Sequence, residues 1–498
     1  MSKSSGMKLP TGWIRTSLAN VGDVVSGATP KTSVTEYWDG DIPWITPDDL
    51  SKNPAKRTRA GRRSLTQVGY DSCSTRMVER GSVLFSSRAP IGYVTIADNA
   101  LCTNQGFKTV VPTSAVSSDY LYWYLQYKTS DITAEASGTT FKEISGRKFA
   151  ETELLLPPVA EQHRIVDALE DHLSRLDAAC AALQRSLSRT SSLRQAAISR
   201  ILRGERVPLR LDEGTAEDLN PQTRLPRQDH PWNIPDGWIW TTIGGLFSVR
   251  VGTTPSRKNP DLWSGCIPWV SSGEVNFRRI ANTREHITEE AVGNKRTRLH
   301  PAGTVMIAMI GEGKTRGQVA ILDIEATHNQ NCASIRVSET QILPEYIYLV
   351  LEQRYLESRR ASSGGNQPAL NKAKVEAIPV PLPPLATQRR IVAEADEFGE
   401  VIKHLRAELE TTLKRAANLR QSVLSHAFSG KLAAQDRADE PASALLERIR
   451  AEREAQGGGK AKRATRRPRK QAVNVAAPPP PTTTTPVPTT AVQQELPL

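Results

Sequence analysis

With 498 residues, a formal net charge of +12 and a mean hydropathy of −0.42, the chain is long enough for two to four domains. No apolar stretch approaches the roughly 20 residues that a membrane-spanning helix needs, and the first residues lack the apolar segment of a signal peptide. Five widely spaced cysteines without a CxxC pair argue against a disulfide framework and a zinc site, so we expect a cytoplasmic protein.

The basic charge is unevenly distributed. Seven lysines and arginines lie within residues 460–470, where there is no acidic residue. The rest of the chain is only mildly basic. Charge alone is therefore weak support for nucleic-acid binding.

Residues 9–156 are predicted to form a mixed α/β domain of short strands. Glycine, proline, aspartate and asparagine turns separate the apolar runs. Strands are expected at Ile42–Ile45, Ser82–Phe85, Gly92–Ile96 and Phe107–Val111, and a helix at Asp119–Tyr127.

A long helix is predicted for residues 157–204, after Pro157-Pro158 and before Gly204. Its apolar residues step by threes and fours, at Ile165, Leu169, Leu173, Leu176, Cys180, Leu183 and Leu187. Polar residues flank this narrow seam, which is typical of a coiled coil. About 43 helical residues make a rod of roughly 65 Å.

After a proline- and charge-rich linker at residues 205–233, the sequence repeats itself. Residues 234–382 have the order of the first domain. Motifs recur 225 or 226 residues later: Gly12-Trp13 as Gly237-Trp238, Gly27-Ala28-Thr29-Pro30 as Gly252-Thr253-Thr254-Pro255, Ile42-Pro43-Trp44 as Ile267-Pro268-Trp269, Asn104-Gln105 as Asn329-Gln330, and Gln162-His163-Arg164-Ile165-Val166 as Gln388-Arg389-Arg390-Ile391-Val392. The period is too long for a solenoid, so the chain is a tandem duplication.

The second copy of the long helix is predicted at residues 383–430, with apolar positions at Ile391, Ala395, Phe398, Ile402, Leu405, Leu409 and Ala416. A short helical extension at 431–456 precedes a basic and Pro/Thr-rich tail at 457–498 that is disordered by composition. We expect an α+β protein with pseudo-twofold symmetry, in which the two rods pack antiparallel and separate the domains. Packing of each helix on its own domain is the alternative.

No catalytic constellation is found in the sequence. Gly313-Lys314-Thr315 resembles the end of a phosphate-binding loop, but Ala308 replaces the glycine that such a loop requires. The histidines do not pair at metal-ligand spacing, and no glycine-rich cofactor loop is present. We therefore predict a non-catalytic protein without a cofactor.

Polar and basic residues on predicted loops are the candidates for binding DNA. The asparagine-glutamine pairs suit bidentate contacts to adenine but serve equally well as turn caps, and Trp38 and Trp263 favour core packing over base stacking. The DNA-binding candidates are Lys31, Arg88, Asn104, Gln105, Thr139, Lys142, Lys258, Lys314, Arg316, Asn329, Gln330 and Gln367. The candidates for a subunit interface lie on the long helices: Ile165, Leu169, Leu176, Leu183, Ile391, Phe398, Leu405 and Leu409.

The doubled order of these motifs resembles the specificity subunits of type I restriction-modification systems, over residues 9–455. The resemblance implies two target recognition domains, each reading one half of an asymmetric, interrupted site in double-stranded DNA. It also implies that the helices fix the gap and carry two methyltransferase subunits, which bind S-adenosylmethionine. ATP-dependent restriction subunits would join them. The two domains differ in their loops, so the half-sites are expected to differ.

Two other functions stay open at this point. The chain could serve a fused nuclease-methyltransferase as its specificity module, which the length of the neighbouring gene would reveal. It could instead be a protein-only scaffolding adaptor. DNA contacts should weaken steeply with salt, whereas apolar contacts between proteins should not.

Overall fold

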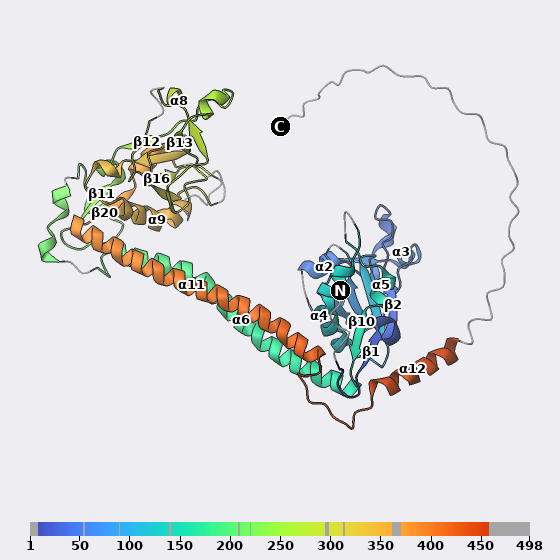
Figure 1. The fold of residues 1–498 in the computed structure, drawn as a ribbon. Helices are drawn as coiled ribbons and strands as arrows, with labels where there is room; N and C mark the ends of the chain where they lie inside the picture. Colours follow the sequence, from blue (N-terminus) through green and yellow to red (C-terminus); the bar gives the residue numbers. More distant parts are fainter. Residues whose placement is uncertain are drawn as a thin grey trace, which may run out of the picture. The chain divides into compact units, whose positions relative to one another are not determined.

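The computed structural model describes residues 8–52, 55–88, 90–138, 142–207, 210–219, 221–293, 298–311, 314–360 and 370–457. The described chain forms two compact units, which are coloured along the sequence in Figure 1. The first unit contains the residues up to Val166 and those from Ala433 onward, and the second contains Asp167–Leu432. The basic block at 460–470 lies outside the described residues.

The first globular domain, residues 9–156, combines three small sheets with short helices. Its strands are β1 Ile14–Ser17, β2 Gly22–Ser26, β3 Trp38–Ile45, β4 Arg57–Thr58, β5 Arg63–Leu65, β6 Val83–Ser86, β7 Val94–Ala97, β8 Cys102–Thr103, β9 Phe107–Pro112 and β10 Glu153–Leu156. Its helices are α1 Leu18–Val21, α2 Pro47–Lys52, α3 Gln67–Asp71, α4 Ser118–Glu135 and α5 Gly146–Ala150. The sheets have the orders β2-β9-β6-β7-β4, β5-β3-β8 and β1-β10, and α4 packs on β6 and β7 (Figure 1).

The second globular domain, residues 234–382, repeats this arrangement strand by strand. Its strands are β11 Ile239–Thr242, β12 Val249–Val251, β13 Ile267–Val270, β14 Arg278–Ile280, β15 Glu285–Ile287, β16 Val305–Ala308, β17 Val319–Leu322, β18 Thr327–His328, β19 Cys332–Ile335 and β20 Pro379–Leu382. Its helices are α7 Ile243–Leu246, α8 Glu289–Gly293, α9 Pro344–Arg360 and α10 Lys372–Glu376. The sheet orders β12-β19-β16-β17-β14, β15-β13-β18 and β11-β20 match those of the first domain.

The apolar runs of the sequence became the central strands. All four residues of β6 and of β16 are buried, because these strands lie in the middle of the five-stranded sheets. The mixed α/β prediction for both domains is thereby confirmed. The first strand of each domain pairs with the last, with Ile14 opposite Leu156 and Ile239 opposite Leu382. These short strands form through partners that are distant in the sequence, which local patterns do not reveal.

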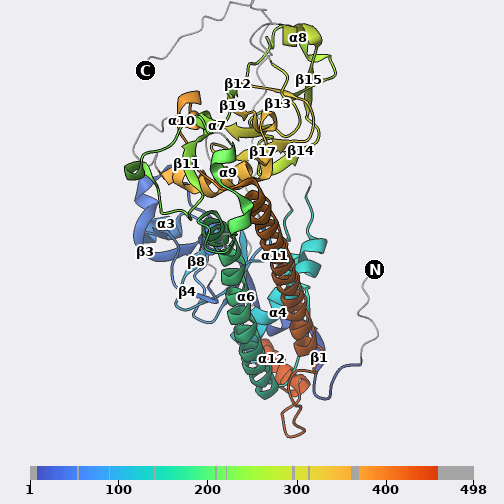
Figure 2. The same cartoon turned by 90° about the vertical axis from the view of Figure 1, so that its left-hand side faces the viewer.

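The two long helices are α6 Val159–Leu202 and α11 Leu385–Phe428, each of 44 residues. In the second unit they run antiparallel and side by side (Figure 2). Asp177 of α6 forms an ion pair of 2.6 Å with Arg420, whereas Arg194, further along α6, lines a groove with Ile402. Later residues of α6 therefore lie beside earlier residues of α11, as expected for antiparallel helices.

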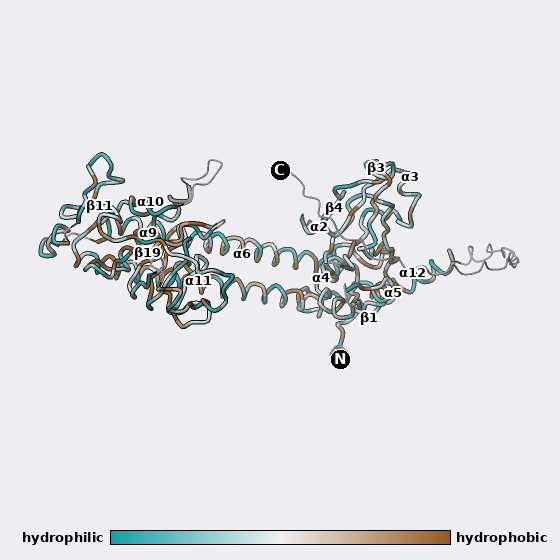
Figure 3. Tube along the Cα trace, turned by 90° about the horizontal axis from the view of Figure 1, so that it is seen from above, coloured by the Kyte–Doolittle hydropathy of each residue, from teal (hydrophilic) through white to brown (hydrophobic). Residues whose placement is uncertain are grey.

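The apolar seam is only partly closed by this packing. Polar and apolar residues alternate along both helices (Figure 3). Leu193, Leu405 and Leu419 are 51%, 42% and 53% exposed. At the other end, Ile201 of α6 and Ile391 of α11 are buried in the core of the second globular domain.

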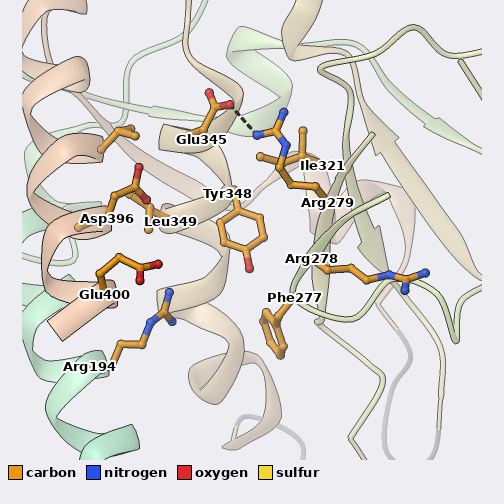
Figure 4. A pocket seen from close by; sticks show the side chains of 13 residues that line it. Arg194, Phe277, Arg278, Arg279, Ile321, Glu345, Tyr348, Leu349, Asp396 and Glu400 are labelled. Atoms are coloured by element: carbon orange, nitrogen blue, oxygen red, sulfur yellow. Dashed lines mark hydrogen bonds and ion pairs between the residues drawn. The ribbon is translucent and has the colours of Figure 1, made fainter. Parts of the chain in front are cut away.

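A cavity of about 590 Å³ lies where the helices meet this domain (Figure 4). Arg194 of α6 and Asp396 of α11 face it, and Arg194 forms an ion pair with Glu352. Burial, together with the negative charge of nearby Glu345, raises the pKa of Asp396.

A buried glutamine joins each domain to the start of its long helix. The Gln162 side chain accepts a hydrogen bond from the Ser117 backbone N–H at 2.7 Å and donates to the carbonyl oxygens of Ala115 and Pro157 at 2.9 and 3.0 Å. Gln388 repeats this pattern in the second unit, accepting from the Leu343 N–H. The glutamine of the repeated helix-entry motif is therefore a fixed structural link.

The segments that follow the two helices also correspond to each other. Residues 205–233, predicted as a linker, pack on the second unit, where Glu213 pairs with Arg390 at 2.6 Å. The extension predicted at residues 431–456 contains α12 Ala442–Gly457, which ends one residue later than expected, and it packs on the first unit, where Asp439 pairs with Arg164 at 2.5 Å. Both pairs are related by 226 residues. The duplicated unit thus includes a third part, which closes each domain.

Across the described ranges, no helix combines the length and apolar character needed to cross a bilayer.

Candidate nucleic-acid interface

Most of the predicted binding loops of the first domain meet at one edge of its five-stranded sheet. There β2 and β6 end and β9 begins. We call this set of loops the first loop edge; it comprises residues 27–31, 87–93, 104–106 and 137–143, apart from residues 89 and 139–141, which are not described. Backbone hydrogen bonds join them: Ala28 to Thr103 at 3.0 Å, Ser87 to Gly106 at 2.7 Å, and Ile144 to Ser87 at 3.1 Å.

The second domain builds the equivalent second loop edge from residues 252–258, 309–318 and 329–331, of which 312 and 313 are not described. Here Thr253 bonds to the His328 carbonyl at 3.0 Å, and Met309 bonds to Asn331 at 2.8 Å. Loops that lie far apart in the sequence therefore form one surface in each domain.

A glycine sets how closely the first of these loops approaches its neighbour. A Cβ atom on Gly27 would overlap the carbonyl oxygens of Thr103 and Asn104. At Gly252 it would overlap those of His328 and Asn329. These glycines are required for close backbone approach, which explains why both copies begin this motif with glycine.

Each asparagine of the asparagine-glutamine pairs caps its own turn. The Asn104 Oδ1 atom accepts a hydrogen bond from the Gly106 N–H at 2.9 Å, and the Asn329 Oδ1 atom accepts from Asn331 at 3.1 Å. Asn329 is only 7% exposed. Of the two interpretations left open by the sequence, this geometry supports the turn cap.

Replacing Asn104 or Asn329 with alanine is expected to destabilise its domain by about 1 kcal/mol, because the capped N–H loses its acceptor. Aspartate keeps the acceptor oxygen, so Asn104→Asp should unfold close to the wild type. Thermal unfolding of the three single variants measures the difference. An alanine variant with unchanged stability and altered sequence specificity would assign the amide to base reading instead.

The glutamines of the same pairs face solvent. Gln105 is exposed, and its Oε1 atom accepts a hydrogen bond from the Thr29 hydroxyl. Gln330 is held in the same way by Thr254. A threonine in each Gly-x-Thr-Pro loop thus orients the glutamine while its amide N–H₂ group is available to a ligand.

The basic candidates have different environments. Lys31, Lys142, Lys258 and Lys314 are exposed, and Arg88 lies 4.0 Å from Glu143. Arg316 differs from these residues: it is only 5% exposed and is covered by its own domain, so a phosphate contact there stays a prediction. Thr139 and Gln367 lie outside the described residues.

Trp38 packs inside the protein, as favoured from the sequence, and Trp263 packs partly buried against a small core cluster. Trp38 is 4% exposed and contacts Trp44 edge to face at 5.1 Å, and Trp263 contacts Trp269 at 4.9 Å. An arginine covers each pair. Arg63 stacks on Trp38 and Arg257 on Trp263, both 3.5 Å from the ring centroid.

A basic segment of the first domain was missed from the sequence. Residues 56–63 contain five lysines and arginines, and this density was the available signal. The structure neutralises much of it: Arg57 and Lys56 pair with Asp119 at 2.9 and 2.6 Å, and Arg59 pairs with Asp98 at 2.6 Å. Among the described residues, no group of three or more histidine, cysteine or acidic side chains is placed to hold a metal ion.

Comparison with known proteins gives the family. The model of the type I restriction modification DNA specificity domain matches residues 10–183 and 235–413, once in each repeat. The MjaIX type I restriction enzyme specificity subunit of Methanocaldococcus jannaschii is 29% identical over 387 residues, or 76% of this chain and 84% of that protein. The EcoBI specificity subunit of Escherichia coli is 24% identical, over 91% of this chain and 94% of that protein.

Two solved structures share the fold. One comes from a study of complex assembly and conformational transition of the type I R-M system, with a TM-score of 0.64 and 18% identity. The other is the HsdS subunit of Thermoanaerobacter tengcongensis, with a TM-score of 0.54 and 18% identity. Each comparison covers 86% of this chain and 100% of the other. The chain therefore belongs to the type I restriction-modification DNA specificity family and is a specificity subunit of such a system.

Proposed function

We propose that the chain reads an asymmetric, bipartite sequence in double-stranded DNA, one half-site with each globular domain. The two loop edges are the surfaces that contact the DNA. The proposal rests above all on one observation: equivalent backbone contacts build the same edge twice, with the Gly-x-Thr-Pro loop and its glutamine in the same place.

Unlike side chains on this common frame support two different half-sites. Arg63 lies opposite Trp44 in the sheet of the first domain, whereas Glu285 lies opposite Trp269 at the equivalent position of the second. Lys108 of β9 is replaced by Ala333 of β19. Arg63 and Glu285 carry opposite charges at matched positions, which favours different contacts in the two half-sites.

Methyl transfer and cleavage belong to partner subunits in this proposal. Two methyltransferase subunits would bind S-adenosylmethionine, and ATP-dependent restriction subunits would complete the cytoplasmic complex. Of the candidates for this interface, Ile165, Leu169 and Ile391 are fully buried within the chain and serve its own packing. The outer candidates are Leu176, Leu183, Phe398, Leu405 and Leu409, which are partly or fully exposed on α6 and α11.

Gln105→Ala and Gln330→Ala are expected to relax specificity in opposite halves of the target. A bidentate amide contact contributes about 1–3 kcal/mol of discrimination, or roughly 10- to 100-fold. Methylation of a library of duplexes by the chain with its methyltransferase subunit measures the effect. Each variant is the control for the other. Gln222 is an exposed residue of the segment 205–233, and Gln222→Ala should leave the specificity for both half-sites unchanged.

The salt dependence of DNA binding by the same complex distinguishes a DNA-reading subunit from a protein-only scaffold. The logarithm of the binding constant for target DNA should fall linearly with the logarithm of the salt concentration, because phosphate contacts release counterions. If both glutamine variants methylate DNA fully and with unchanged specificity, Gln105 and Gln330 do not read bases. Salt-insensitive assembly without DNA binding would instead favour the scaffold.

A further inference from the structure

The second globular domain has a cavity of about 280 Å³ beside its loop edge. Gly252, the first residue of the second loop edge, lines it. Five lining side chains can carry positive charge and none is acidic: Arg250, Arg298, His300, His328 and Lys372. A basic cavity at this place suits a negatively charged group.

A buried histidine lines this cavity. His328 is 1% exposed, and its Nδ1 atom lies 3.0 Å from the carbonyl oxygen of Asn329, to which it donates. Its Nε2 atom has no hydrogen-bond partner among the described residues. Buried polar atoms nearly always have a partner. Because Nδ1 donates, Nε2 of the neutral ring is an acceptor, and it can bind an anionic oxygen only after it takes up a proton.

The arginines and the lysine, rather than the histidines, give the cavity its positive charge. Burial lowers the pKa of His328 to about 4, and burial with the charges of His328 and Arg336 lowers the pKa of His300 to about 3. The exposed Arg250 and Arg298 have no acidic partner among the described residues, whereas Lys372 lies 3.4 Å from Glu376 and Arg336 lies 2.5 Å from Glu339. Glu376 and Glu339 therefore offset only part of the positive charge around the cavity.

The first domain does not share this chemistry. The register of the matched strands places Val25 where the second domain has Arg250, Val78 where it has His300, and Thr103 where it has His328. Gly146 begins α5 at the position of Lys372 in α10. The cavity is thus particular to one half of the duplication.

We propose that this cavity binds a phosphate group of the DNA backbone beside the half-site read by the second domain, with Arg250 and Arg298 at its mouth and His328 on its buried side. The proposal rests on the proposed DNA-reading function and adds to it an anchor that carries no sequence preference. To donate from Nε2, His328 must take up a proton. A bound phosphate favours that proton and raises the pKa, so affinity should increase as the pH falls from neutral toward 5.

The test uses the full chain with its methyltransferase subunit and the two variants that install first-domain residues, Arg250→Val and His328→Thr. Each should weaken binding to target and nontarget duplexes alike, by roughly tenfold, and reduce the salt slope by about one. The half-site preference should persist. His328→Thr should also flatten the pH dependence, which a merely structural role would leave unchanged. Arg278→Val, an exposed arginine on the outer strand β14, is the matched control.

Inorganic phosphate added to the chain without DNA distinguishes the two sources of a phosphate. A phosphate-dependent rise in thermal stability that Arg250→Val abolishes, with DNA binding unchanged in both variants, would overturn the proposal in favour of a free phosphate. If both variants keep the wild-type DNA affinity, salt slope and phosphate response, the proposal is overturned and the histidines serve packing alone. If the wild-type complex fails to read any sequence, the proposed function fails; if it reads one and the variants match it, only the cavity proposal fails.

Discussion

Replacing Gln162 with leucine is expected to lower the free energy of unfolding of the first unit by about 3 kcal/mol. The substitution leaves the Ser117 N–H and the carbonyl oxygens of Ala115 and Pro157 without their partner. A buried unsatisfied backbone group costs about 1–3 kcal/mol, and leucine recovers only part of this through its apolar contacts. Thermal or denaturant unfolding of the purified complex measures the loss.

Gln105→Leu is the matched control for this experiment. The same chemical change occurs there at an exposed side chain with one hydrogen bond, to Thr29. Its stability should change by less than about 1 kcal/mol. A Gln162→Leu protein as stable as the control would show that the repeated helix-entry glutamine does not hold the domain to the helix.

Gly252→Ala is expected to abolish recognition of one half-site, with a loss of at least roughly 100-fold in methylation of the target, equal to about 2.7 kcal/mol. The added methyl group overlaps the carbonyl oxygens of His328 and Asn329, so the Gly-x-Thr-Pro loop must move away from the loop that carries Gln330. Gly27→Ala should have the same effect on the other half-site. Competition between duplexes altered in one half measures both.

Gly273→Ala provides the control, because a Cβ atom there meets nothing within 4 Å. It should leave methylation of both halves unchanged. If Gly252→Ala folds and methylates both halves like the wild type, the tight contact between these loops is not needed for recognition.

The duplication and the apolar periods were enough to predict the repeated mixed domains and the two long helices. The strands that were easiest to predict, such as β6 and β13, are apolar runs that pair with strands close to them in the sequence. The Pro-Pro dipeptides correctly marked where α6 and α11 begin. These features depend on local sequence, which a single chain shows directly.

Features that depend on distant partners escaped prediction. The segments 205–233 and 431–457 share few residues, Ala216 and Ala442 among them, yet both donate a backbone hydrogen bond of 3.0 Å to the glycine that opens a domain. Asn329 and Gln330 are adjacent in sequence, but one caps a buried turn and the other faces solvent. Residue type alone does not distinguish these roles, because both amides can cap a turn or contact a base.

The most direct test of the account is to express the chain with its methyltransferase subunit in a host free of adenine methylation and map methylated adenines at single-base resolution. We expect an interrupted motif with two unlike halves, absent when this chain is omitted. The Gly252→Ala chain should lose recognition of one half of the motif, while the requirement for the other half persists. A soluble complex that methylates no motif, or one continuous motif that Gly27→Ala and Gly252→Ala alter identically, would contradict recognition of separate half-sites by the two domains.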